Sequence, residues 1–355
     1  MPRRTRLILV ILLPIQIILL MILKSFPEFV ETYYSQGIYP FFSKIPRWLF
    51  GWLPFSIGDV FYPLIGIMAL RWIYKNFRRL KYQPIALVLD VVAAASVVYF
   101  VFHILWGLNY YRVPLHRTLD VDRDYTTEEL IDMTKRFIQK SNEVHEALGY
   151  ADTTKIDLPY TNREIMDAAV LGYDELKDQY PNLAYSPISV KQSGWSLGLT
   201  YMGYSGYYNP FSGEAQVNRL IKSYRFPVVS SHEIAHQLGY AAENEANFLA
   251  TLATVHHPDP YVQYTGYIFA LRYLVNEVAR RDLDTYRELV EQIHPGILKG
   301  YKEMREFWES YENPLENISK AFWNQFLKAN NQEKGIMSYS YMVALVINYF
   351  EDRSL

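Results

Sequence analysis

The sequence predicts a mostly helical α+β fold, in which three membrane-spanning helices precede one extramembrane domain. Long apolar runs are confined to the first third of the 355-residue chain. Amphipathic helical patterns with start and stop signals dominate the rest. One stretch, residues 185–218, instead alternates glycine, aromatic and β-branched residues, which predicts a small antiparallel sheet.

The composition excludes several classes of site. The chain contains no cysteine, which rules out disulfides, thiolate metal sites and cysteine nucleophiles. Its formal net charge of -2 gives no reason to expect nucleic acid as a partner. The chain has 31 tyrosines, too many for the sequence to single out one of them as a catalytic donor.

The N-terminal third is predicted to cross the membrane three times. Residues 7–23 carry no charge and are just long enough for a hydrocarbon core about 30 Å thick. No small-residue cleavage pattern follows them, which favours an uncleaved anchor over a signal peptide. Residues 52–74 form a weaker span, interrupted by Asp59 and two prolines, and residues 84–106 form a strong one that begins near Asp90. We interpret both aspartates as carboxylates at the interface or facing the bundle.

Basic residues set the expected orientation. Arginines precede the first span, and lysines and arginines crowd the loop between the second and third spans. The positive-inside rule assigns both groups to the cytoplasm, so the third span should end outside, where Trp106, Tyr110 and Tyr111 predict an aromatic belt. We therefore expect a multi-pass protein of the cell membrane, with an anchor over residues 1–110 and an extracytoplasmic domain over residues 111–355.

Helices are expected throughout this domain except in the sheet region. A helix should begin at Thr126 and stop at Gly149, and another should begin at Thr161, which has the capping-box spacing to Glu164. Residues 341–350 are apolar but too short to span a membrane, so they predict a buried helix.

The segment "VVSSHEIAHQLG", residues 228–239, carries the strongest chemical signal. His232 and His236 lie four residues apart, on one face of a helix, where two imidazoles can bind one zinc ion. Pro227 suits the first turn of this helix, and Gly239 suits its end. Glu233 lies about 100° around the helix from His232, so it can reach a metal-bound water and act as a general base.

Zinc in a hydrolase takes a third protein ligand and keeps a fourth position for water. The following segment, "AAENEANFLATLA", predicts a second helix on which Glu243 and Asn247 share a face with the small residues Ala246 and Ala250. We expect Glu243 to be the third ligand and rank Glu245 second. Asn247 should accept a hydrogen bond from a ligating histidine and fix its tautomer.

Substrate contacts are less well defined by the sequence. Residues 213–218, "GEAQVN", are either an ordinary strand or an edge strand along which a peptide could add, contacting Ala215, Gln216 and Val217. Donors to a tetrahedral intermediate are sought among five polar side chains near the motif: Tyr207, Tyr208, Asn209, His256 and His257. For the two histidines, a helix end is the alternative interpretation.

The two motif segments together resemble those of the gluzincin metallopeptidases, which pair HExxH with a downstream Glu-x-x-x-Asp on a second helix. The resemblance implies a zincin-like domain in which His232, His236 and Glu243 bind zinc and Glu233 is the base. The chain departs from that pattern because Asn247 stands where the aspartate is usual, and because the interval from His236 to Glu243 is short.

Two further comparisons of pattern bear on the site. Ala242 occupies the place of the third histidine of the metzincins, which excludes that ligand set. The whole chain is also similar to a family of uncharacterised bacterial membrane proteins with three N-terminal spans, a HExxH domain and an ending like "FLKANNQEKGIMSYSYMVALVINY".

The expected function is a membrane-anchored, zinc-dependent metallopeptidase that hydrolyses peptide or protein substrates. The alternative is a non-catalytic receptor or assembly protein that zinc stabilises. The open coordination argues against this alternative, because structural zinc is usually closed by four protein ligands. An intramembrane protease is disfavoured by Lys222 and Arg225, which lie just before the motif.

Overall fold

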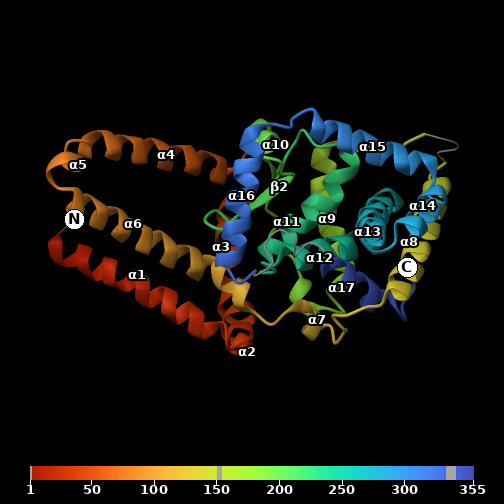
Figure 1. The fold of residues 1–355 in the computed structure, drawn as a ribbon, viewed down its shortest axis with the longest axis horizontal. Helices are drawn as coiled ribbons and strands as arrows, with labels where there is room; N and C mark the ends of the chain where they lie inside the picture. The colour runs from red at the N-terminus through yellow and green to blue at the C-terminus, as the bar shows by residue number, and fades with distance from the viewer. Residues whose placement is uncertain (1, 150–153, 333–340) are drawn as a thin grey trace.

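The computed structural model describes residues 2–149, 154–332 and 341–355. Within these residues, three helices are long and apolar enough to cross a membrane, and they extend to one side of the molecule (Figure 1). They are α1 (Arg3–Leu23), α4 (Ile57–Asn76) and α6 (Pro84–Leu105). The predicted spans are confirmed as helices, although α4 begins later than predicted because Ser56 caps it by accepting from the Asp59 amide.

The three helices are not equally packed. α1 and α6 run along each other, whereas α4 stands apart from this pair (Figure 1). Asp90 of α6 accepts from Arg6 of α1 at 3.3 Å and pairs with Arg79 of α5 (Arg79–Tyr82) at 2.8 Å. The carboxylate therefore lies at the same end of the spans as the basic residues, as an interfacial aspartate would.

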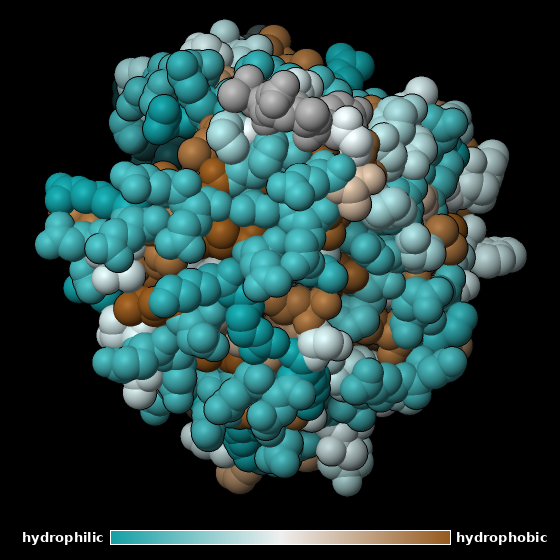
Figure 2. Space-filling view, turned by 90° about the vertical axis from the view of Figure 1, so that its right-hand side faces the viewer, coloured by the Kyte–Doolittle hydropathy of each residue, from teal (hydrophilic) through white to brown (hydrophobic). Residues whose placement is uncertain are grey.

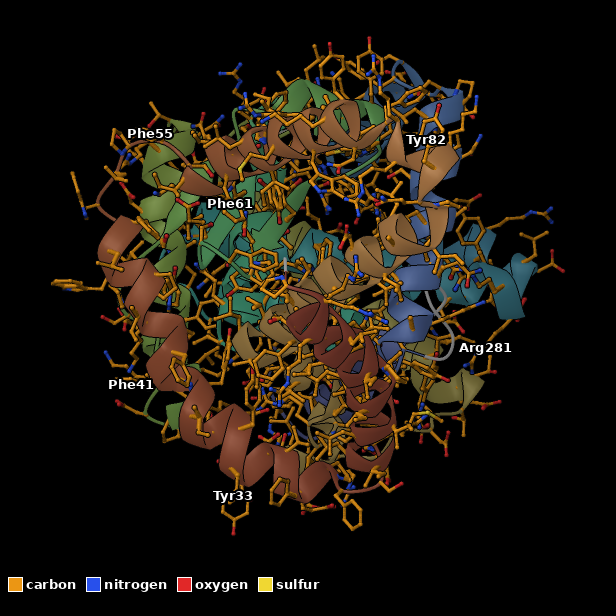
Figure 3. All side chains as sticks on the ribbon, turned by 90° about the vertical axis from the view of Figure 1, so that its left-hand side faces the viewer. Tyr33, Phe41, Phe55, Phe61, Tyr82 and Arg281 are labelled. Atoms are coloured by element: carbon orange, nitrogen blue, oxygen red, sulfur yellow. The ribbon has the colours of Figure 1, made fainter. Side chains whose placement is uncertain are left out.

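A helical segment that the sequence analysis did not assign lies between α1 and α4. It consists of α2 (Pro27–Phe29), the π-helix η1 (Val30–Ile38) and α3 (Tyr39–Phe50). Figure 3 looks from the membrane end and shows this segment lying across the view, roughly at right angles to the spans. One side of it packs against the short helix η2 (Gly107–Tyr111), which follows the third span.

The rest of the chain forms the domain, whose end away from the spans is largely hydrophilic (Figure 2). The helix predicted to start at Thr126 begins there, with a capping box to Glu129, and the predicted capping box of Thr161 with Glu164 is present. Residues 341–350 form a buried helix as expected. In the family-like ending, residues 333–340 lie outside the described residues. The longer helices are α8 (Thr127–Ala147), α9 (Asn162–Leu176), α11 (Phe226–Gln237), α12 (Glu243–Val255), α13 (Pro260–Arg281), α14 (Leu283–Glu291), α15 (Pro295–Glu309), α16 (Pro314–Ala329) and α17 (Tyr341–Phe350); the shorter ones are α7 (Leu115–Thr118), η3 (Pro181–Leu183), α10 (Ser196–Tyr201) and η4 (Ser223–Arg225).

The sheet is mixed, so the prediction of an antiparallel sheet is wrong for one of its two pairings. Its order is β1-β3-β2, with β1 (Val190–Gln192) parallel to β3 (Glu214–Val217) and β2 (Gly206–Asn209) antiparallel to it. Two parallel strands need a crossover rather than a hairpin. Here α10 and β2 supply it, in a region where the sequence pattern predicts only strands.

Of the two alternatives that the sequence offers for residues 213–218, the ordinary strand is right and the edge strand is wrong. β3 is the central strand, so it pairs on both sides and has no free edge along which a peptide could add. Ala215, Gln216 and Val217 are buried. The two outer strands, β1 and β2, each leave one edge without a strand partner among the described residues. β2 is the one beside Glu233, because a Cβ on its Gly206 would lie 2.7 Å from that side chain.

Candidate metal centre

Two short helices position the motif. α11 has Pro227 in its first turn and ends before Gly239, whose φ of +88° permits the sharp turn into α12. A Cβ on Gly239 would lie 2.9 Å from the Tyr39 ring and 3.0 Å from the Asn109 side chain, so the site also requires glycine for space. Ala246 and Ala250 are fully buried between the elements, as the small-residue face predicts.

Three side chains converge where the two helices meet. The Nε2 atom of His232 lies 3.3 Å from Oε2 of Glu243, and Nε2 of His236 lies 3.6 Å from Oε1 of the same carboxylate. One ligand atom from each residue lies within 4.8 Å of the other two. Since zinc binds imidazole and carboxylate groups at about 2 Å, these three side chains fit one such ion with little movement.

Hydrogen bonding prepares His236 for coordination. Its Nδ1 lies 2.8 Å from the Tyr240 carbonyl, to which it donates, so the lone pair of Nε2 faces Glu243. Burial lowers the pKa of His236 to about 4, despite the opposing charge of Glu243, which keeps the ring in its neutral, metal-binding form.

His232 is held differently. Burial favours its neutral form, but the Glu243 carboxylate, with smaller contributions from Glu233 and Asn247, raises the pKa of His232 above its usual value. Its Nδ1 has no hydrogen-bond partner among the described residues, and neither has Nδ2 of Asn247. The contribution of Asn247 to the pKa of His232 indicates that the two side chains interact, while the role of Asn247 in fixing the tautomer stays a prediction.

Glu233 lies beside the ligands rather than among them. Its side chain faces β2, where a Cβ on Gly206 would come within 2.7 Å of Oε1. Burial raises the pKa of Glu233 to about 8. The charge of Glu243 adds to this shift, and that of His232 opposes it. Oε2 of Glu233 has no partner in the part of the chain that the structure describes. A buried carboxyl with such a pKa suits proton transfer near neutral pH.

The structure distinguishes the two glutamates that the sequence offers as third ligand. Glu245 turns away from the histidines and accepts a hydrogen bond from the Leu115 amide at 2.7 Å. Burial raises its pKa to about 7, against the effects of that hydrogen bond and of nearby Arg112. Glu243, not Glu245, is therefore the carboxylate that lies with His232 and His236.

Three residues from the membrane end bind the C-terminus of α11, and sequence reasoning missed this role for all three. The Tyr39 hydroxyl donates to the Gln237 carbonyl at 2.8 Å, Trp106 Nε1 donates to the His236 carbonyl at 2.9 Å, and Arg112 donates to the Gly239 carbonyl at 3.0 Å. They satisfy carbonyls that a helix end leaves without partners. The sequence signal was limited to the aromatic belt, which includes Trp106.

Tyr110, like Trp106, was predicted as part of the aromatic belt at the membrane. In the structure it lies near the site. Its hydroxyl is buried and has no hydrogen-bond partner among the described residues. Burial, and next the charge of Glu243, raise the pKa of Tyr110 well above its usual value, so the phenol lies within electrostatic reach of that ligand.

Three of the five donors considered from sequence are engaged elsewhere. The Tyr207 hydroxyl donates to Asp59 at 2.7 Å. His256 contacts the Leu252 carbonyl at 2.9 Å, and His257 contacts the Ala168 carbonyl at 3.0 Å. The two histidines thus terminate α12 and hold neighbouring backbone, which is the helix-end interpretation.

Three apolar spans and a buried His-His-Glu cluster define a membrane protein with a candidate metal site beside its spans. The chain belongs to the family described as protein of unknown function DUF3810, whose profile matches residues 34–347, across both anchor and domain. No curated protein and no solved structure matches the chain.

Proposed function

We propose that this protein is a membrane-anchored, zinc-dependent metallopeptidase with a gluzincin-like site in a zincin-like domain. The convergence of His232, His236 and Glu243 from two helices, with Glu233 beside them, carries the proposal. Three protein ligands leave a coordination position for water, as hydrolytic zinc sites do.

Bound zinc would polarise the scissile carbonyl and acidify the attacking water. Glu233 would take the proton of that water and deliver it to the leaving amine. The buried position of this carboxyl keeps its pKa near the range in which it can do both. The unpaired edge of β2 beside Glu233 offers backbone groups to an extended peptide, in place of the central strand that the sequence suggested.

Tyr110 is the side chain best suited to stabilise the oxyanion of the tetrahedral intermediate. Such a donor must be preorganised next to the metal and must not be used by another acceptor. The Tyr110 hydroxyl is buried and has no hydrogen-bond partner among the described residues, and the charge of Glu243 acts on it, which supports this role.

The domain is proposed to lie outside the cytoplasm. The basic residues before α1 and around α5 support this orientation, because they are expected to stay on the cytoplasmic side. A reporter fused after Leu355 should be active only outside the cytoplasm, and cytoplasmic activity would reverse the orientation.

The function is tested with the full-length protein, purified in detergent, loaded with zinc and incubated with a mixed peptide library. Mass spectrometry of new termini should find cleavage. The Glu233→Gln variant should keep its zinc and its fold but lose activity by about 10²–10⁴-fold or more, as expected for loss of a general base. Cleavage unchanged in Glu233→Gln would contradict the proposed base. No cleavage by the zinc-bound protein would favour a zinc-stabilised scaffold.

A further inference from the structure

Helix α3 has its polar and apolar faces in the reverse of the usual arrangement. Its buried face carries Tyr39, Ser43 and Arg47, which are 1%, 6% and 2% exposed. Its outer face carries Phe41 and Trp48, which are 68% and 73% exposed. A surface helix of a water-soluble domain buries its apolar face, so the outer face of this segment is built for an apolar environment.

Helix α16 repeats this feature on the other side of the spans (Figures 1 and 3). Leu315, Ile318 and Phe322 lie along one face and are at least half exposed, and Phe326, farther along the same face, packs against Phe102 of α6 and Tyr110. We call the outward apolar residues of both segments the collar: Phe29, Tyr33, Phe41, Ile45, Trp48, Leu315, Ile318 and Phe322. Figure 3 shows Tyr33 and Phe41 on the outer side of the η1–α3 segment.

The collar lies where the spans end, and exposed apolar side chains lead into it from α1 through Ile22, Phe26 and Phe29. Lys24 and Lys44 are exposed next to it. Aromatic side chains with flanking lysines are typical of helices that lie in the boundary between headgroups and acyl chains. This continuity identifies the occupant of the collar as the lipid bilayer rather than a soluble partner.

The same elements hold the candidate metal site. Trp106 is the first residue after α6, and it donates directly to the carbonyl of the ligand His236 at 2.9 Å. Tyr39, the first residue of α3, donates to the next carbonyl at 2.8 Å. A single side chain therefore connects the site to a span end, and another connects it to the collar segment, without a flexible linker in either connection.

We propose that the collar is embedded in the interfacial layer of the bilayer and that the zinc centre acts on polypeptides at that surface, namely segments of membrane-inserted proteins close to where they leave the bilayer. The substrate part of this proposal rests on the proposed function. The location of the collar does not.

The location is tested in proteoliposomes with single nitroxide labels, which the cysteine-free chain makes straightforward. Labels at Phe41→Cys, Trp48→Cys and Ile318→Cys should be more accessible to oxygen than to a water-soluble nickel chelate. Leu283→Cys on α14, an exposed apolar position 52% exposed and away from the collar, is the matched control and should show the reverse. Collar labels that match this control would overturn the proposal. Protection from both reagents would also overturn it, because it would mean that a second protein surface covers the collar.

The substrate class is tested with a single-span protein carrying a sequence cleaved in the library experiment. The sequence is placed about 5 or about 40 residues from the span, a flexible reach of roughly 12 or 35 Å. The near site should be cut at least about tenfold faster in proteoliposomes, as an effective-concentration advantage predicts. Equal rates would overturn the substrate class and leave the peptidase proposal intact. If the library gives no cleaved sequence, the peptidase proposal and this substrate class fail together, and the labels still decide the position of the collar.

Discussion

The indole Nε1 of Trp106 donates a hydrogen bond to the backbone carbonyl of His236 at 2.9 Å, which joins the end of the third span to a candidate metal ligand. Trp106→Phe should keep the ring contact with His236 but leave that carbonyl with the Gly239 amide at 3.0 Å and the longer 3.4 Å bond from Tyr39. We expect the free energy of unfolding to fall by about 1–2 kcal/mol, with weaker zinc retention against a chelator. Trp308→Phe on α15 is the control, and an equal effect there would contradict the account.

The hydroxyl of Tyr110 should matter for catalysis and little for folding, because it makes no hydrogen bond to the described residues. Tyr110→Phe is expected to lower kcat by about 10²-fold or more, the usual effect of removing one oxyanion donor, with KM and metal content near wild type. Tyr111→Phe, the adjacent buried tyrosine, should leave kcat unchanged. A kcat for Tyr110→Phe equal to that of Tyr111→Phe would remove Tyr110 from the mechanism.

A buried ion pair between β1 and β3 also holds the start of the second span. Glu214 accepts from Lys191 at 2.7 Å and from the Gly58 amide in the first turn of α4 at 2.7 Å, and both side chains of the pair are nearly inaccessible. Glu214→Gln would leave the Lys191 charge buried without its partner, so it should cost about 3–5 kcal/mol of stability. Adding Lys191→Met should recover part of this loss in thermal unfolding. If the double variant loses more stability than the two single variants lose together, the ion pair is not the cause of the loss.

The stability of the domain should fall in mild acid because of His145. Burial, and next the neighbouring His294, lower the pKa of His145 to about 4, whereas an unfolded histidine titrates near 6.5. The neutral ring is therefore favoured in the folded state. The contribution of this ring to the stability of the fold is fully present above pH 6.5 and is lost as the pH falls towards 4. Fully buried His145 should contribute up to about 3 kcal/mol to this loss.

The measurement is chemical unfolding at several pH values between 6.5 and 4. His145→Gln should have the shallower acid dependence, while His256→Gln at an exposed position should follow the wild type. Parallel curves for His145→Gln and the wild type would refute this contribution.

Local signals in the sequence predicted much of the fold, whereas contacts between distant segments were not predictable from it. Capping residues such as Thr126 and Thr161 act within a few residues, so their helices begin where expected. The i, i+4 spacing likewise predicted that His232 and His236 share a helix face. The parallel pairing of β1 with β3 depends on a crossover, and a strand pattern carries no information on its neighbour.

The candidate site shows the same difference between local signals and contacts between distant segments. The helical register favoured Glu243, and the structure brings that residue to the histidines. The roles of Tyr39 and Trp106 depend on how the anchor docks onto α11, across 198 and 130 residues of chain. Trp106 was predicted only as part of an aromatic belt, and Tyr39 carried no prediction, so composition alone could not reveal their contacts with α11.

The most direct test of the central claim is the zinc content of the purified full-length protein. The wild type and Glu245→Gln should each retain about one zinc per chain, because Glu245 binds the Leu115 amide and not the cluster. Glu243→Gln and His232→Ala should lose the metal while remaining folded. A wild-type protein that binds no zinc, or zinc lost in Glu245→Gln and retained in Glu243→Gln, would contradict the account.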